Sequence, residues 1–178
     1  MNKHILSLGL LFITIVLFLS SCSLCGSRTQ MLSKDNDEGK ADDRLKQIIE
    51  AIKSKDKDSL KTIFSKQALN EAEDLNGRTD YLFNFVQGNI ESWETIVHGA
   101  TNESNDHGSR IKKSSSWYNV ITDKQKYLFF FWECTIDTDH PENVGIYMLQ
   151  VIKAEDKVTQ FDGGGQLTKC AGIYKPKE

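Results

Sequence analysis

Proline is scarce in this sequence, with 2 in 178 residues, and this scarcity argues against a disordered chain. An excess of charge of one sign is also missing, because 22 Lys and Arg face 25 Asp and Glu, a formal net charge of -3. Without a basic excess or cluster, nucleic acid is not an expected partner. The composition is that of an ordinary globular protein, and the length suits a single domain.

Motifs that mark common catalytic and cofactor sites are absent. The sequence contains no HExxH, no Gly-x-Ser-x-Gly and no P-loop, and the three glycines at 163–165 predict a hairpin turn. Two acidic runs, at 35–38 and 137–143, lack the glycine spacing of a calcium-binding loop. We therefore predict neither a bound metal ion nor a cofactor.

Long apolar runs are absent except at the N-terminus. Residues 5–19 are apolar apart from Ser7, Gly9 and Thr14, and they follow the positive charge of Lys3. As a helix this run would rise about 22 Å, less than the roughly 30 Å of a bilayer core. The pattern is that of a signal peptide.

The four residues after this run, Leu19-Ser20-Ser21-Cys22, resemble the lipobox of bacterial lipoproteins. The resemblance implies cleavage before Cys22 and lipidation of Cys22, whose thiol forms a thioether with a diacylglyceryl group, with palmitate among the acyl chains. Acyl chains of this kind hold a protein at a membrane without a spanning helix. We predict a lipoprotein signal peptide at 1–21 and an extracytoplasmic protein anchored to the cell membrane. An ordinary cleaved leader and an uncleaved anchor are the alternatives.

Polar residues dominate the stretch after Cys22, and residues 22–41 are predicted to be a flexible tether. Residues 42–178 are predicted to form one domain that opens with helices. Apolar residues spaced at i, i+3, i+4 and i+7 predict the first helix at 42–52, and shorter helices follow at 58–64 and 68–75. A further helix is predicted from residue 79 to Trp93.

Strands are predicted after the helices, and the stretch 101–108 between them is predicted to be a loop. The predicted strands are 110–122, 126–137, 144–153, 158–162 and 166–174. Short connections predict antiparallel pairing. The expected fold class is α+β, with the N-terminal helices packed on one face of a curved antiparallel sheet.

Two predicted strands are apolar on both faces. Residues 127–136 place aromatic or aliphatic side chains at even and odd positions, and residues 146–152 do the same. A sheet covered by helices on one face alone would alternate apolar and polar residues. The second face therefore needs a cover: a barrel-like curl, another segment, a ligand or a second subunit. Of these, a homodimer or protein partner is favoured.

Several stretches carry a resemblance to a known family. The strongest are TDKQKYLFFFW at 122–132, NVGIYMLQVIKAED at 143–156 and AGIY at 171–174. They resemble surface lipoproteins of low-GC Gram-positive bacteria that are catalogued only as a domain of unknown function. The resemblance covers residues 42–176 and implies a cone-shaped fold like nuclear transport factor two and the cystatins. It implies no catalytic residues.

Catalytic candidates are few. Glu133, among aromatic residues, and His98 are the weak candidates for a general acid or base. The alternatives are that Glu133 faces water near a strand end and that His98 is partly buried. Cys134 and Cys170 are either bridged or free thiols.

Binding is therefore the leading functional hypothesis, with a non-enzymatic ligand-binding or protein-interaction module at the membrane. A small hydrolase or isomerase acting in the cone pocket is the alternative, and self-association alone is a third. The candidate binding residues are Trp93, Trp117, Tyr127, Phe129, Phe131 and Tyr147.

Overall fold

The computed structural model describes residues 25–97 and 101–176. Cys22 and His98, both singled out by the sequence, lie outside the described residues. The chain divides into two units, Met1–Gly39 and Lys40–Glu178, and the account below concerns the second. No helix within the described ranges is both long enough and apolar enough to cross a bilayer.

Among the described residues, four helices precede the sheet: α2 (Cys25–Ser54), α3 (Lys57–Thr62), α4 (Lys66–Glu71) and α5 (Leu75–Phe85). The spacing predicted for the first helix is confirmed, because Leu45, Ile48 and Ile49 are buried in the core. Most of the predicted tether is also helical in backbone, since α2 begins at Cys25. That segment lacks proline, so its polar composition does not prevent a helix.

The helices α3, α4 and α5 each begin at a side-chain cap. The carboxylate of Asp56 accepts hydrogen bonds from two backbone N–H groups of α3, and Ser65 and Asp74 cap α4 and α5. The helix predicted at 68–75 is α4, which ends at Glu71, and α5 begins within the predicted stretch. The N–H of Gly77 donates to Asp74 in the first turn of α5, so the cap places this glycine inside a helix.

The predicted helix to Trp93 is wrong beyond α5. Gly88 has φ +88°, a left-handed conformation, and a Cβ there would lie 2.2 Å from Oδ1 of Asp123. The N–H of Asn89 then donates to the same carboxylate. This turn ends the helical run, so Trp93 lies on strand β1 instead.

Six strands form one sheet with the order β1-β3-β4-β5-β6, and β2 pairs with β3. Their bounds are β1 (Ile90–Val97), β2 (Asn102–Asp106), β3 (Ser109–Thr122), β4 (Lys126–Asp137), β5 (Gly145–Lys153) and β6 (Gly172–Ile173). All pairs are antiparallel except β5 with β6. The three predicted central strands are confirmed to within one residue.

Three other predictions are wrong. The expected loop at 101–108 is strand β2 and a tight turn. The expected strand at 158–162 is a short helix, α6 (Lys157–Gln160). The expected strand at 166–174 is reduced to the two residues of β6. In the last two stretches, packing on the sheet overrides local alternation.

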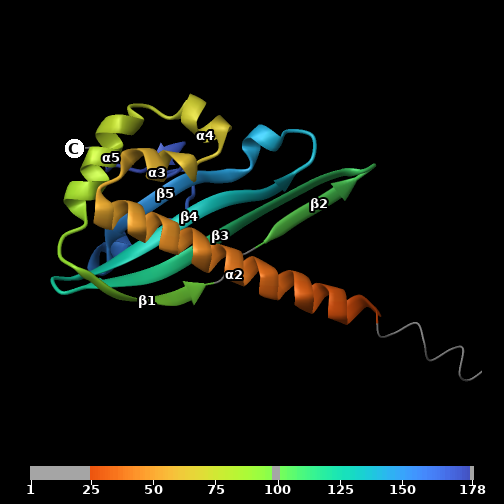
Figure 1. The fold of residues 1–178 in the computed structure, drawn as a ribbon, viewed down its shortest axis with the longest axis horizontal. Coiled ribbons are helices and arrows are strands. Elements are labelled where there is room, and N and C mark those ends of the chain that lie inside the picture. Colours follow the sequence, from red (N-terminus) through yellow and green to blue (C-terminus); the bar gives the residue numbers. More distant parts are fainter. Residues whose placement is uncertain (1–24, 98–100, 177–178) are drawn as a thin grey trace, which may run out of the picture. The chain divides into compact units, whose positions relative to one another are not determined.

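The main core lies between the helices and one sheet face. In Figure 1, α2 passes in front of the strands, and α3, α4 and α5 lie beside β5 and β4. Leu45 and Ile48 of α2 share the buried cluster with Phe129, Phe131 and Tyr118 of the sheet. The α+β class is therefore confirmed, with N-terminal helices on a curved, open sheet that is consistent with a cone-like fold.

The second face of the sheet is covered by residues 157–171, here named the cover segment. The ring of Phe161 packs edge-on against Trp117 at 5.0 Å and Phe130 at 5.2 Å between centroids. A Cβ at Gly164 would lie 2.7 Å from the Phe130 ring, so the backbone touches that ring directly. Of the covers that the sequence left open, another segment of the same chain therefore lies on this face.

Candidate functional site

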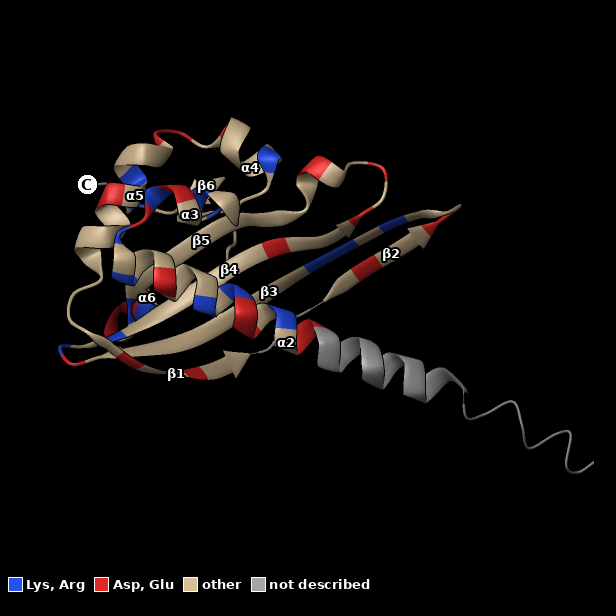
Figure 2. Ribbon diagram, viewed as in Figure 1, with Lys and Arg blue, Asp and Glu red and all other residues tan. Residues whose placement is uncertain are grey.

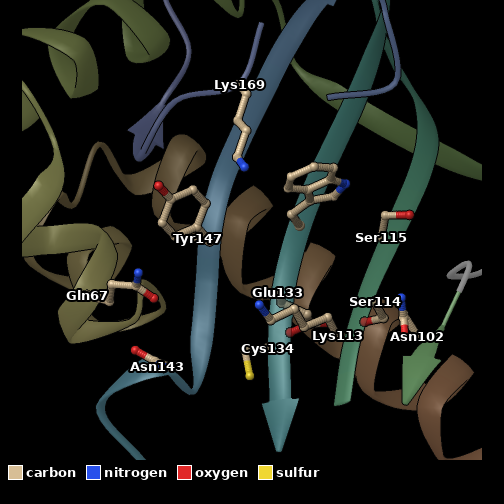
Figure 3. A pocket seen from close by; sticks show the side chains of 11 residues that line it. Gln67, Asn102, Lys113, Ser114, Ser115, Glu133, Cys134, Asn143, Tyr147 and Lys169 are labelled. Carbon is tan, nitrogen blue, oxygen red and sulfur yellow. The ribbon is translucent and has the colours of Figure 1, made fainter. Parts of the chain in front are cut away.

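A pocket of about 460 Å³ lies where β3, β4 and β5 meet α4 and the cover segment. Its lining residues are Gln67, Asn102, Lys113, Ser114, Ser115, Trp132, Glu133, Cys134, Asn143, Tyr147 and Lys169. In Figure 3, Lys169 extends toward Tyr147, with Gln67 and Asn143 on one side of the pocket and Ser114, Ser115 and Asn102 on the other. The walls combine apolar surface with many hydrogen-bonding groups.

A bulge places Tyr147 in the pocket wall. Trp132 pairs with Met148 and Glu133 pairs with Ile146, so Tyr147 is left without a partner on β4. The hydroxyl of Tyr147 donates to Glu71 at 2.8 Å. Burial, together with this bond, raises the pKa of Tyr147, which stays protonated.

Glu133 is buried, so the alternative that it faces water is wrong. It is 5% exposed, and Nε of Arg44 on α2 donates to its Oε2 at 3.2 Å. The pair joins residues 89 positions apart. Instead of standing alone against aromatic walls, the carboxylate is held by a guanidinium, which is the geometry of an ion pair that orients both groups.

A second polar contact lies under the same helix. The hydroxyl of Tyr118, which is fully buried, donates to Asp42 at 3.0 Å. Burial raises the pKa of Tyr118 far above its ordinary value. Sequence reasoning missed Arg44 as the partner of Glu133 and Asp42 as the partner of Tyr118. The signal for Arg44 is its place four residues before buried Ile48, which puts a charge beside the apolar face.

The six aromatic residues predicted to bind do not come together. Tyr127, Phe129 and Phe131 are at most 1% exposed and lie in the core shared with the helices. Trp93 packs edge-on against a core tyrosine and Trp117 lies under the cover segment. Of the six, Tyr147 lines the pocket.

The remaining titratable candidates lie elsewhere. His107 and His140 are exposed in turns, and no histidine among the described residues lines the pocket. Within residues 25–97 and 101–176, no group of three or more His, Cys, Asp or Glu could hold a metal ion. Cys134, in the pocket wall, and Cys170 are free thiols, and burial raises the pKa of each.

Charge around the pocket is uneven. Figure 2 shows Lys and Arg along the part of β3 that pairs with β2, with acidic residues beside them on β2. Lys113 pairs in register with Asn102, so the β2–β3 hairpin carries it to the pocket rim. Nζ of Lys169 lies 5.8 Å from the centroid of the Trp132 ring. The rim therefore presents two cations near an aromatic wall.

A comparison with protein families finds one match. The family model described as "Domain of unknown function (DUF5104)" matches residues 47–154, which include α3, α4 and α5, strands β1 to β5 and most of the pocket. No curated protein matches the chain.

Proposed function

Because the chain belongs to the DUF5104 family, whose function is unknown, we propose its function from the pocket and from the N-terminal sequence. The protein is a lipoprotein held at the cell membrane by Cys22, facing the extracytoplasmic side. Its domain is a non-enzymatic module that binds a small ligand in the pocket between the sheet and α4.

The observation that carries this proposal is the pocket itself. About 460 Å³ falls within the roughly 300–1,000 Å³ of small-molecule sites. The lining offers amide and hydroxyl groups of Gln67, Asn143 and Ser115, which suit recognition by hydrogen bonds. Glu133, the acid that a hydrolase or isomerase would need, is already paired with Arg44. These features favour binding over general acid or base chemistry.

The membrane anchor rests on the sequence Leu19-Ser20-Ser21-Cys22. Its test compares Cys22→Ala with Cys25→Ala in cells fed an alkyne analogue of palmitate. We expect the label and the membrane-bound protein to disappear in the first variant and to persist in the second, because Cys25 follows a leucine and lacks the required small neighbours. Labelling of Cys22→Ala at the level of the unchanged protein would refute the anchor.

The ligand site is tested with the full chain in detergent and a library of small molecules, followed by thermal unfolding. Gln67→Trp fills the pocket from α4, and Asn70→Trp places the same bulk on an exposed position of that helix. A ligand at about 100 times its Kd stabilises a folded protein by about 2.7 kcal/mol. We expect this stabilisation to be lost in Gln67→Trp alone. Equal stabilisation of both variants would place binding elsewhere.

A further inference from the structure

The pocket carries two lysines that are not neutralised by the protein. Lys113 and Lys169 are exposed, and neither has an ion-pair partner among the described residues. Other lysines of the domain do have such partners, as in Lys57 with Asp80 and Lys126 with Glu94. In a chain with more acids than bases, two available cations at one cavity favour an anionic ligand.

Acidic groups in the lining do not cancel these charges. Glu133 is the acid among the lining residues, and the guanidinium of Arg44 already lies 3.2 Å from its Oε2. The carboxylate and Arg44 offset each other, which leaves the charges of Lys113 and Lys169 facing the cavity. A carboxylate or a phosphate on the ligand would form ion pairs with these two ammonium groups.

Hydrogen-bond acceptors lie on the opposite wall. The amide nitrogen of Gln67 donates to Glu71 at 2.9 Å, and the Tyr147 hydroxyl donates to the same carboxylate. The amide nitrogen of Asn143 is likewise bound, to Asp137 at 2.8 Å. Each amide therefore retains its oxygen acceptor and a second N–H, and a ligand with several hydroxyl groups, which both donate and accept hydrogen bonds, can use them.

The aromatic wall of the pocket suits an apolar face on the ligand. Trp132 presents a flat apolar surface within the pocket, beside the polar groups described above. Rings that carry hydroxyl groups have an apolar face and a polar rim, which this combination matches. Resting on the proposed ligand site, we infer that the pocket takes an anionic carbohydrate, a sugar that carries a carboxylate or a phosphate.

The test is isothermal titration of the full chain in detergent with four probes: glucuronic acid, glucose 6-phosphate, glucose and inorganic phosphate. We expect at least one charged sugar to bind, and glucose and phosphate alone to bind at least tenfold more weakly. The two charged probes separate the carboxylate from the phosphate. Binding should also weaken as salt is added.

Three lysine variants test whether Lys113 and Lys169 bind the charged group of the sugar. Lys113→Ala and Lys169→Ala should each weaken binding of the charged sugar about tenfold, the loss of one bond to a charged group. Lys124→Ala, an exposed lysine in the β3–β4 turn outside the pocket lining, should leave it unchanged. The inference is overturned if no charged sugar binds, if glucose binds equally well, or if the three variants behave alike.

The results that would overturn the assignment to anionic carbohydrate differ from those that would overturn the proposed ligand site. A different small molecule that binds the full chain and is displaced by Gln67→Trp would keep the pocket as a ligand site while overturning its assignment to anionic carbohydrate. A pocket that takes no ligand from the library or from the four probes would remove both.

Discussion

The cover segment leads to a quantitative prediction for Phe161→Ala. The ring of Phe161 makes edge contacts with Trp117 and Phe130, and such pairs contribute about 0.5–1.5 kcal/mol each beyond buried area. The side chain is half-buried, so the area that it removes from water adds about 1 kcal/mol. We expect the free energy of unfolding to fall by about 2–4 kcal/mol.

The assay is urea unfolding of the compact unit Lys40–Glu178, followed by circular dichroism. Val158→Ala is the matched control, because Val158 lies in the same segment with 94% of its surface exposed. We expect that variant to change the stability by less than about 0.5 kcal/mol. If both variants cost the same small amount, Phe161 does not seal the sheet and the reasoning about the cover segment is refuted.

Three further predictions concern the same domain. Gly164→Ala should lower the free energy of unfolding by about 2–3 kcal/mol in the same urea assay, because φ of Gly164 is +76° and the new Cβ would lie 2.7 Å from the buried Phe130 ring. An unchanged urea midpoint of unfolding would contradict this contact. The amide of Asn143 and neighbouring backbone N–H groups lower the pKa of Asp137, so its stabilising contribution is present above the unfolded-state pKa and is lost as the pH falls through the folded-state pKa. The stability gap between the unchanged protein and Asp137→Asn should therefore shrink as the pH falls below about 5, and a gap that is constant with pH would refute this linkage. Cys134 and Cys170 should react slowly with iodoacetamide in the folded protein and completely in urea without reductant, and mass spectrometry records the extent of alkylation. Protection from alkylation that persists in urea would indicate a disulfide.

Where local pattern and tertiary packing agree, the sequence predicted the fold well. The strand at 126–137 has the predicted bounds because an apolar run is bordered by turn residues on both sides. The first helix keeps its predicted buried face because Leu45 and Ile48 follow helical spacing. In both cases the signal lies within about a dozen residues.

The failures have a different origin. Phe161 becomes buried only against Trp117 and Phe130, which are distant in sequence, and its own neighbour Val158 stays exposed. Local alternation around it therefore predicted a strand that does not form. The helix predicted to reach Trp93 failed because one glycine with positive φ outweighs an apolar stripe.

The candidate site could be predicted only in part. Glu133 was recognised as an unusual carboxylate on an aromatic strand, but its partner Arg44 is 89 positions away and cannot be paired with it from one sequence. Lys169 was missed because it was placed on the strand predicted at 166–174, which forms only at Gly172–Ile173. Pocket walls that come from α4, the four strands β2 to β5, the turn at 141–143 and the cover segment need the register of the sheet, which the sequence pattern does not supply.

The position of the cover segment along the chain has a consequence for folding kinetics. Strands β3, β4 and β5 all precede residues 157–171, so the strands can pair before their second face is closed. In that interval Phe130 and Trp117 lie open to water, and two such chains can associate through them. Docking of Phe161 is unimolecular, whereas association is bimolecular. The yield of refolded protein should therefore fall as the chain concentration rises, although the finished domain buries this face within itself.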